Sequence, residues 1–312
     1  MGPMCQTEPL GSDLNAAASA PSQWATCFLR VRLRPLIQIG MGMFTPDVGA
    51  YLRRIGYSGP NAPSAECLRE IQRCHTLTIP FENLDVVAGR PIPLDGPSLE
   101  GKLVRDERGG YCFEHNGYML SVLREMGFRV APFLARVRLN IPADVTMPRT
   151  HLVLKVETDQ GTRLFDVGFG GTGVSDTPSL DTEESQPTRD GMRRIQRQDR
   201  ELVLQAHDGA AWTDVYKVAP DEAAPVDWEV SNWFTSTHPQ SRFRQNLIVA
   251  RSLPDGRCAI LNRELTIRRR DGHVERRTLE SAADLLAALR KHFRLCFAPG
   301  TRFGAGDVSW PV

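Results

Sequence analysis

The chain has 312 residues, of which 41% are hydrophobic and 24% are charged, an ordinary composition for a globular protein. This length exceeds one compact core of the usual size, so we expect two or three subdomains. The 38 basic side chains nearly balance the 37 acidic ones, which gives no reason to expect nucleic acid or a membrane surface as a partner.

The seven cysteines are scattered along the chain and form no CxxC pair. A disulfide framework or a zinc site requires paired spacings, so we expect reduced thiols, no bound metal and a cytoplasmic location. No apolar run approaches the length of about 20 residues that spans a bilayer.

Residues 1–42 differ from the rest of the chain. Small polar residues are followed by FLRVRLRPLIQIG, which carries three arginines and no acid. A targeting segment can have this composition. We prefer a disordered extension that arises from an upstream start codon, because Met41 and Met43 directly precede the first helix signal.

Helical periodicity then begins. Thr45 and Pro46 suit the cap and the first position of a helix that Gly56 ends. A second helix is predicted from Ser64, and a third from Cys112, ending at Gly127.

After Gly127 the pattern becomes strand-like. The segments HLVLKVE and TRLFDVG flank a Thr-Asp-Gln-Gly turn, and a second hairpin is predicted around Asp208 and Gly209. Residues 174–200 are polar and are predicted to form an exposed loop. Four more strand-like segments precede a final helix from Ser281. Helices first and antiparallel strands afterwards predict an α+β fold.

The segment RGGYCFEHN, residues 108–116, places Cys112 between a glycine-containing loop and a helix. A helix N-terminus favours a thiolate, and a nearby histidine favours it further. The glycines allow close approach of an acyl group, and backbone N–H groups there can hold an oxyanion. An ordinary buried cysteine is the alternative, but the loop-to-helix position fits it less well. We predict that Cys112 is a nucleophile.

A nucleophilic cysteine needs a base, and the base needs an orienting partner. His151 opens one strand of the first predicted hairpin, and Asp166 closes the other. Their side chains can therefore stand side by side on one face of the sheet. His115, three residues after Cys112 on the same helix, is a competing base. We rank it lower because nothing nearby in the sequence would orient it.

Residues 168–173 match the pattern GxGxxG after a strand. A dinucleotide-binding fold requires a helix directly after these glycines, within a βαβ unit. A polar segment follows instead, so we reject that interpretation. Close approach of a phosphate-bearing ligand to these glycines stays open.

Taken together, RGGYCFEHN, PRTH and LFDVGFGG resemble the arylamine N-acetyltransferase family in order and spacing. TIPFENL and NWFTSTHPQS strengthen the resemblance, which runs from about Met43 to the C-terminal helix and excludes residues 1–42. It implies a helical bundle over residues 43–127 with the nucleophile, a β-barrel over 128–230 with the histidine and aspartate, and an α/β lid over 231–312. The implied core is related to that of cysteine proteases.

The resemblance also implies site residues. A Cys-His-Asp triad falls on Cys112, His151 and Asp166. Phe81 matches a position that lines the acceptor pocket, and Phe234 and Gln240 match positions near bound coenzyme A.

The implied reaction is a ping-pong transfer of an acetyl group from acetyl-coenzyme A, a co-substrate, to an arylamine, arylhydrazine or N-hydroxyarylamine. It needs no permanently bound cofactor and no metal. Two other functions stay open: an amide synthase of the same fold that releases a carrier-bound acyl chain, and a cysteine hydrolase or transglutaminase-like enzyme. A non-catalytic binding module would require the triad to be accidental.

Overall fold

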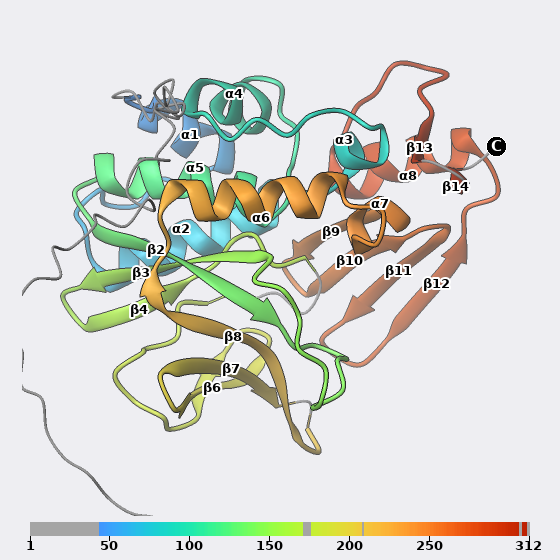
Figure 1. Cartoon of the computed structure of the whole chain (residues 1–312). Helices are drawn as coiled ribbons and strands as arrows, with labels where there is room; N and C mark the ends of the chain where they lie inside the picture. The colour runs from blue at the N-terminus through green and yellow to red at the C-terminus, as the bar shows by residue number, and fades with distance from the viewer. Residues whose placement is uncertain (1–43, 171–175, 208, 306–307, 311–312) are drawn as a thin grey trace, which may run out of the picture. The chain divides into compact units, whose positions relative to one another are not determined.

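The computed structural model describes residues 44–170, 176–207, 209–305 and 308–310. The predicted N-terminal extension and residues 171–173 of the GxGxxG pattern lie outside these ranges. Within them, helices come first along the chain, followed by two large antiparallel sheets (Figure 1).

The three predicted helices are present as α1 (Val48–Ile55), α2 (Ala65–Thr78) and α5 (Cys112–Glu125). Ser64 caps α2 as predicted, because its hydroxyl accepts from the Cys67 N–H. The predicted cap of α1 is wrong: Asp47, rather than Thr45, accepts from the Ala50 N–H. Asp is as good a cap as Thr, and it lies at the position where helical geometry starts.

Short helical segments that the sequence pattern did not predict connect α2 to α5. They are α3 (Leu84–Val87), α4 (Gly96–Glu100) and a π-helical turn, η1 (Gly101–Arg105). Two further helices were also missed: α6 (Pro225–Thr237) and α7 (Arg242–Gln245). None of the short segments is long enough to show a helical period, and α6 is polar on several sides.

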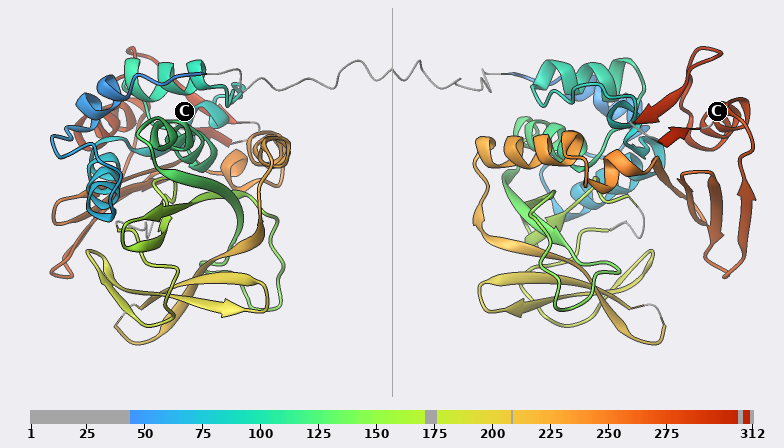
Figure 2. Two further views of the ribbon diagram at one scale, coloured as in Figure 1. Left: turned by 90° about the vertical axis from the view of Figure 1, so that its left-hand side faces the viewer. Right: turned by 45° about the vertical axis from the view of Figure 1, so that its right-hand side comes forward.

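A seven-stranded antiparallel sheet has the order β4-β3-β2-β8-β7-β6-β5. Its strands are β2 (Arg129–Val137), β3 (His151–Thr158), β4 (Gly161–Phe165), β5 (Gln186–Thr188), β6 (Gly191–Gln198), β7 (Glu201–His207) and β8 (Trp212–Glu222). The sheet curls (Figures 1 and 2), and α5 packs against β2 and β3. Both predicted hairpins, β3–β4 and β7–β8, are confirmed.

The curl brings the chain after β4 back against that strand. The Leu164 N–H donates to the Pro178 carbonyl and the Leu180 N–H to the Thr162 carbonyl, both at 2.9 Å. The prediction of a loop over residues 174–200 is therefore wrong in its second half, which forms β5 and β6. Strand β6 was missed because arginines occupy most positions where a strand usually carries apolar side chains.

A second, five-stranded sheet has the order β1-β9-β10-β11-β12. Its strands are β1 (Phe81–Glu82), β9 (Ile248–Leu253), β10 (Gly256–Leu261), β11 (Glu264–Arg269) and β12 (Val274–Thr278), and α8 (Ala282–Phe293) packs on it with Leu285, Leu289 and Phe293. A small pair, β13 (Phe303–Ala305) and β14 (Val308–Trp310), follows. Strand β1 comes from the helical part of the chain, so this sheet joins distant segments of the sequence.

The arrangement confirms the α+β prediction. The domain boundaries at residues 43, 128 and 231 stay a prediction. No helix in the described ranges combines the length and the apolar character needed to cross a membrane.

Candidate active site

Cys112 is the first residue of α5, and its side chain is buried. Tyr111 precedes it as the cap, and the Tyr111 N–H donates to the Glu114 carboxylate at 3.0 Å. The thiol Sγ lies 3.5 Å from the Thr150 carbonyl, directly before β3. The first turn of α5 therefore presents Cys112 to the start of β3.

The glycines around Cys112 permit close backbone contacts. A Cβ at Gly109 would lie 2.0 Å from the Pro80 carbonyl oxygen, and one at Gly168 would lie 2.6 Å from the Cα of Cys112. Only a residue without a side chain fits at either place. The loop before Cys112 and the segment after β4 can thus pack directly on their neighbours.

A group of paired charges holds the loop before Cys112. Arg108 donates to Glu82 at 2.6 Å, and Lys102 contacts Glu114 at 2.6 Å and Asp85 at 2.7 Å. Burial lowers the pKa of Arg108, but the charges of Glu82 and Asp85 outweigh it and raise the pKa overall. Arg108 therefore stays charged, and these ion pairs fix both the loop and the first turn of α5.

His151 and Asp166 form a buried hydrogen-bonded pair. The His151 Nε2 atom lies 2.8 Å from Asp166 Oδ2. Because β3 pairs with β4 through Leu154 and Phe165, the two residues are diagonal rather than directly opposite, one step beyond the end of β4. The expectation that they share one face is met.

The ionisation of His151 depends on both neighbours. Burial lowers the pKa of His151, but the Asp166 charge and hydrogen bonds to Asp166 and Cys112 outweigh burial and raise the pKa to about 10. His151 is therefore held as an imidazolium between a carboxylate and the Cys112 sulfur.

Sequence reasoning missed the residues that hold Asp166. Asn116 donates to Asp166 Oδ1 at 2.9 Å and to the Leu152 carbonyl at 2.6 Å, and it accepts from the Val167 N–H at 3.1 Å. Gln72 accepts from the Asp166 N–H at 3.1 Å. The spacing contains one signal: Asn116 follows Cys112 by one helical turn, so both face the same strands.

Two aromatic rings enclose His151. The ring centroid of Phe169 lies 5.2 Å from that of the imidazole, and the centroid of Tyr216 lies 5.0 Å from it. Burial raises the pKa of Tyr216, and the nearby Asp166 charge adds to the rise. The imidazole thus sits in a dry environment, where its interactions with charged neighbours are strong.

Both ring nitrogens of His115, the competing base, contact groups other than Cys112. Its Nδ1 lies 2.7 Å from His75 Nε2, and its Nε2 lies 2.9 Å from the Gly110 carbonyl oxygen. Burial lowers the pKa of His115 to about 4, although the carbonyl contacts oppose the change. The sequence analysis considered only nearby residues as partners of His115; in the structure His75 orients it from α2, 40 residues away in sequence.

The three expected substrate contacts come from two segments of the chain. Phe81 is buried beside the loop before Cys112, bridged to Gly110 and in ring contact with Phe243 at 5.9 Å. Phe234 lies in the last turn of α6 and Gln240 in the turn that follows it, and both contact His238.

Known proteins are similar to this chain over most of its length. The sequence profile of a family described as N-acetyltransferase matches residues 64–300. An arylamine N-acetyltransferase of Escherichia coli is 39% identical over 252 residues, which are 80% of this chain and 89% of the relative.

Solved structures agree with the sequence match. The arylamine N-acetyltransferase of Mycobacterium tuberculosis has a TM-score of 0.76 and 38% identity, covering 78% of this chain and 92% of that chain. The Mycobacterium marinum enzyme, solved in complex with CoA, has a TM-score of 0.75 and 39% identity, covering 78% and 91%. The chain therefore belongs to the arylamine N-acetyltransferase family.

Proposed function

We propose that this protein transfers an acetyl group from acetyl-coenzyme A to the amino group of an arylamine, arylhydrazine or N-hydroxyarylamine, by a ping-pong mechanism through acetyl-Cys112. One observation carries the proposal: the buried His151 lies between Cys112 and Asp166 and is hydrogen-bonded to both. The M. marinum relative, solved in complex with CoA, supports the choice of donor.

In the first half-reaction the Cys112 thiolate attacks the carbonyl carbon of acetyl-coenzyme A. Of the N–H groups in the first turn of α5, that of Glu114 donates to the Tyr111 carbonyl. The N–H groups of Cys112 and Phe113 come before the first bond of the helix and can stabilise the oxyanion. The C–S bond of the donor then breaks. The His151 imidazolium gives its proton to the leaving sulfur, which releases coenzyme A as the thiol.

Thioester formation prepares His151 for its second task. In the free enzyme, Cys112 contributes to the raised pKa of His151 through its charge and its hydrogen bond. An acetylated sulfur carries no charge, so the pKa of His151 falls and the neutral imidazole can accept a proton. Asp166 keeps the ring in place throughout.

In the second half-reaction the amine nitrogen attacks the thioester carbonyl. His151 takes the proton that the nitrogen loses, and the Cys112 thiolate leaves as the amide forms. The enzyme returns to its thiolate–imidazolium state. Base catalysis of this kind contributes roughly 10²- to 10⁴-fold to the rate. Phe81, beside the loop before Cys112, is our proposed contact for the aromatic acceptor, and we keep Phe234 and Gln240 as proposed coenzyme A contacts.

The decisive experiment is the intact mass of the protein after mixing with acetyl-coenzyme A in the absence of an amine. We expect a gain of one acetyl group on the peptide that contains Cys112, and its loss when an arylamine is added. Cys112→Ala is the control and should gain nothing. Release of free acetate without an acetylated protein would instead identify a hydrolase, and acetylation of another cysteine would contradict the assignment of Cys112.

A further inference from the structure

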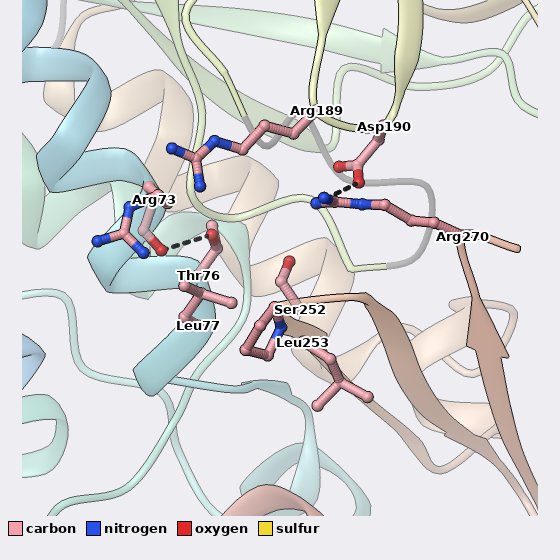
Figure 3. Close-up of a pocket in the computed structure, with 9 residues that line it drawn as sticks. Arg73, Thr76, Leu77, Arg189, Asp190, Ser252, Leu253 and Arg270 are labelled. Atoms are coloured by element: carbon pink, nitrogen blue, oxygen red, sulfur yellow. Dashed lines mark hydrogen bonds and ion pairs between the residues drawn. The ribbon is translucent and has the colours of Figure 1, made fainter.

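Helix α2 has two faces with different surroundings. Arg73, Thr76 and Leu77 line a cavity of about 90 Å³ between α2, the β5–β6 turn and the β9–β10 turn (Figure 3). His75 lies between these residues in sequence, and helical geometry turns it by at least about 100° from each of them. Its side chain is fully buried. The inward face of α2 therefore carries a titratable group that neither the cavity nor the proposed reaction uses.

His75 is the middle member of a buried series of hydrogen bonds. The Tyr51 hydroxyl lies 2.9 Å from His75 Nδ1, and His75 Nε2 lies 2.7 Å from His115 Nδ1. His115 Nε2 lies 2.9 Å from the Gly110 carbonyl oxygen and 3.2 Å from the Pro80 carbonyl oxygen. All three side chains are fully buried. The series therefore runs from α1 through α2 and α5 to the loop before the nucleophile.

The carbonyl at the end of the series fixes the direction of its hydrogen bonds. A carbonyl oxygen only accepts, so His115 Nε2 carries a proton and donates to Gly110. Burial lowers the pKa of His75 well below its ordinary value and that of His115 to about 4, so both rings are neutral at neutral pH. A neutral imidazole has one N–H. His115 Nδ1 therefore accepts from the His75 Nε2–H, and His75 Nδ1 accepts from the Tyr51 hydroxyl.

The Gly110 carbonyl belongs to the peptide group that leads into α5. The N–H of this planar group is that of Tyr111, which points the opposite way and donates to Glu114 at 3.0 Å. The carbonyl also accepts from the Glu82 N–H at 2.7 Å. Since Gly109 and Gly110 give the backbone more freedom than other residues would, these hydrogen bonds select one orientation. The peptide group before the nucleophile is therefore held at both ends.

The His115 N–H also connects this loop to a second segment. Pro80, whose carbonyl it contacts, directly precedes Phe81, and Phe81 is bridged to Gly110. His115 thus lies against both chains of the bridge. One chain carries the proposed acceptor contact, and the other leads to the nucleophile. A neutral imidazole suits this place because a charge would be costly in a dry interior.

We infer that Tyr51, His75 and His115, here called the histidine series, are positioning residues for thioester formation. By holding the Gly110 carbonyl they keep the N–H groups at the start of α5 directed at the thioester carbonyl. The series transfers no proton during the reaction, because the carbonyl at its end fixes its direction. The inference rests on the proposed function and adds residues of α1 and α2 to those that the reaction needs.

The first measurement gives the rate constant and the final extent of thioester formation, from intact mass after rapid mixing with saturating acetyl-coenzyme A. His115→Leu removes the donor to Gly110. We expect its rate constant to fall about tenfold or more, because a displacement of about 1 Å in a catalytic site can cost roughly 10²-fold. The final extent should stay complete, whereas partial unfolding alone would lower the extent at an unchanged rate constant. His115→Gln should restore most of the rate, because its amide can donate to Gly110 and accept from His75.

Tyr51→Phe and Tyr57→Phe are a matched pair at the other end of the series. Each removes one hydroxyl of a buried tyrosine, which donates to His75 in the first case and to the Pro60 carbonyl in the second. Only Tyr51 belongs to the series. The rate constant should therefore fall in Tyr51→Phe, by less than in His115→Leu, and stay at the wild-type value in Tyr57→Phe. Equal rate constants in the two tyrosine variants would overturn the inference.

Nitrogen NMR of the imidazole rings at neutral pH tests the direction of the series without any turnover. We expect both His75 and His115 to be neutral, with the proton on Nε2. A proton on His115 Nδ1 or a charged ring at either position would overturn the inference, and so would a wild-type rate constant in His115→Leu. If that variant does not fold, the ring protons and the tyrosine pair decide in the same way. Failure of the proposed function has a different signature: the wild type would form no thioester, whereas the ring protons would be as expected.

Discussion

The sulfur of Cys112 lies where the first turn of α5, the Thr150 carbonyl and the His151 imidazole meet. The carbonyl accepts from a thiol, whereas the helix end and the imidazolium favour a thiolate. Two of these three neighbours therefore stabilise negative charge on the sulfur. Its chemistry therefore depends on His151 keeping its proton.

The choice between the two buried histidines can be tested directly. His151→Gln should slow thioester formation by roughly 10²- to 10⁴-fold, because the acid and base of both half-reactions is lost. His115→Gln should keep most activity, because a glutamine amide can still donate to the Gly110 carbonyl. The measurement is single-turnover release of coenzyme A, with circular dichroism to check the fold. Comparable losses in the two variants would contradict the assignment.

The pH dependence follows from the sign of the His151 shift. With its pKa raised to about 10, His151 stays charged from acid solution up to that pH, instead of losing its proton near its ordinary value. Its charge therefore contributes stability that is fully present below about pH 6.5 and is lost as the pH rises through about 10. We expect the free energy of unfolding of the wild type, relative to that of His151→Gln, to decrease as the pH rises from about 6.5 to about 10. A constant difference across that range would show that the charge of His151 is not stabilised.

The same charge should be visible in the reactivity of Cys112. Iodoacetamide at mildly acidic pH should modify Cys112 faster than the other cysteines, because thiolate is the reacting species. The rate at Cys112 should drop sharply in His151→Gln and fall in Asp166→Asn, which weakens the imidazolium. Peptide-resolved alkylation against pH measures both effects. If neither substitution altered the profile at Cys112, the triad assignment would fail.

At the scale of elements, α5 and the β3–β4 hairpin are joined by one amide. The buried Asn116 side chain links Asp166, the Leu152 carbonyl and the Val167 N–H. Thus the helix that carries the nucleophile also fixes the end of the hairpin that carries the base. The catalytic geometry then depends on a contact between elements as well as on each side chain.

Asn116→Ala should reveal this link. Each buried group left without a partner costs about 1–3 kcal/mol, so the free energy of unfolding should fall by at least that amount. Activity should fall further than stability explains, because Asp166 loses one of its donors. Urea unfolding and thioester formation rates, both measured where the variant is fully folded, separate the two effects. Full activity in the folded variant would show that Asn116 supports packing only.

Sequence patterns predicted correctly those helices and hairpins whose signals are local. Ser64 and Ser281 cap the helices predicted from them, and the turn after Thr158 closes the predicted hairpin, since capping and turn chemistry act over a few residues. Strand β6 was missed because Arg193 and its neighbours hide the apolar alternation. The contact between His75 and His115 was missed for another reason: it joins two helices, and no local pattern encodes it.

At the scale of the whole molecule, β1 connects the helices to the five-stranded sheet. Its two residues, Phe81 and Glu82, pair with β9. The Glu82 N–H also donates to the Gly110 carbonyl at 2.7 Å, in the loop before Cys112. The C-terminal segment reaches the same loop, because the ring of Phe297 lies 4.8 Å from the guanidinium of Arg108. The loop before the nucleophile is therefore held from both halves of the chain.

Asn83, directly after β1, supports this connection with its side chain. Its Nδ2 donates to the Phe243 and Asn246 carbonyls, and its Oδ1 accepts from the Ile248 N–H, each at 2.8 Å. Because the side chain is buried, Asn83→Ala should lower the free energy of unfolding by about 2 kcal/mol or more. Gln245→Ala, which removes one exposed amide contact nearby, is the control and should change it by less than about 0.5 kcal/mol.

The same substitution should also slow thioester formation, because Asn83 holds β1. When Asn83 no longer anchors the strand, Glu82 and Phe81 lose their fixed position against Gly110, and the loop before Cys112 is held less firmly. Asn83→Ala should therefore slow thioester formation at a temperature where the variant is fully folded, whereas Gln245→Ala should not. Asn83→Asp keeps the acceptor for the Ile248 N–H but turns a carboxylate oxygen toward the Phe243 and Asn246 carbonyls, so it should be at least as slow as Asn83→Ala. Equal rates in all four proteins would mean that the loop is positioned from the helices alone, through Arg108 and Lys102.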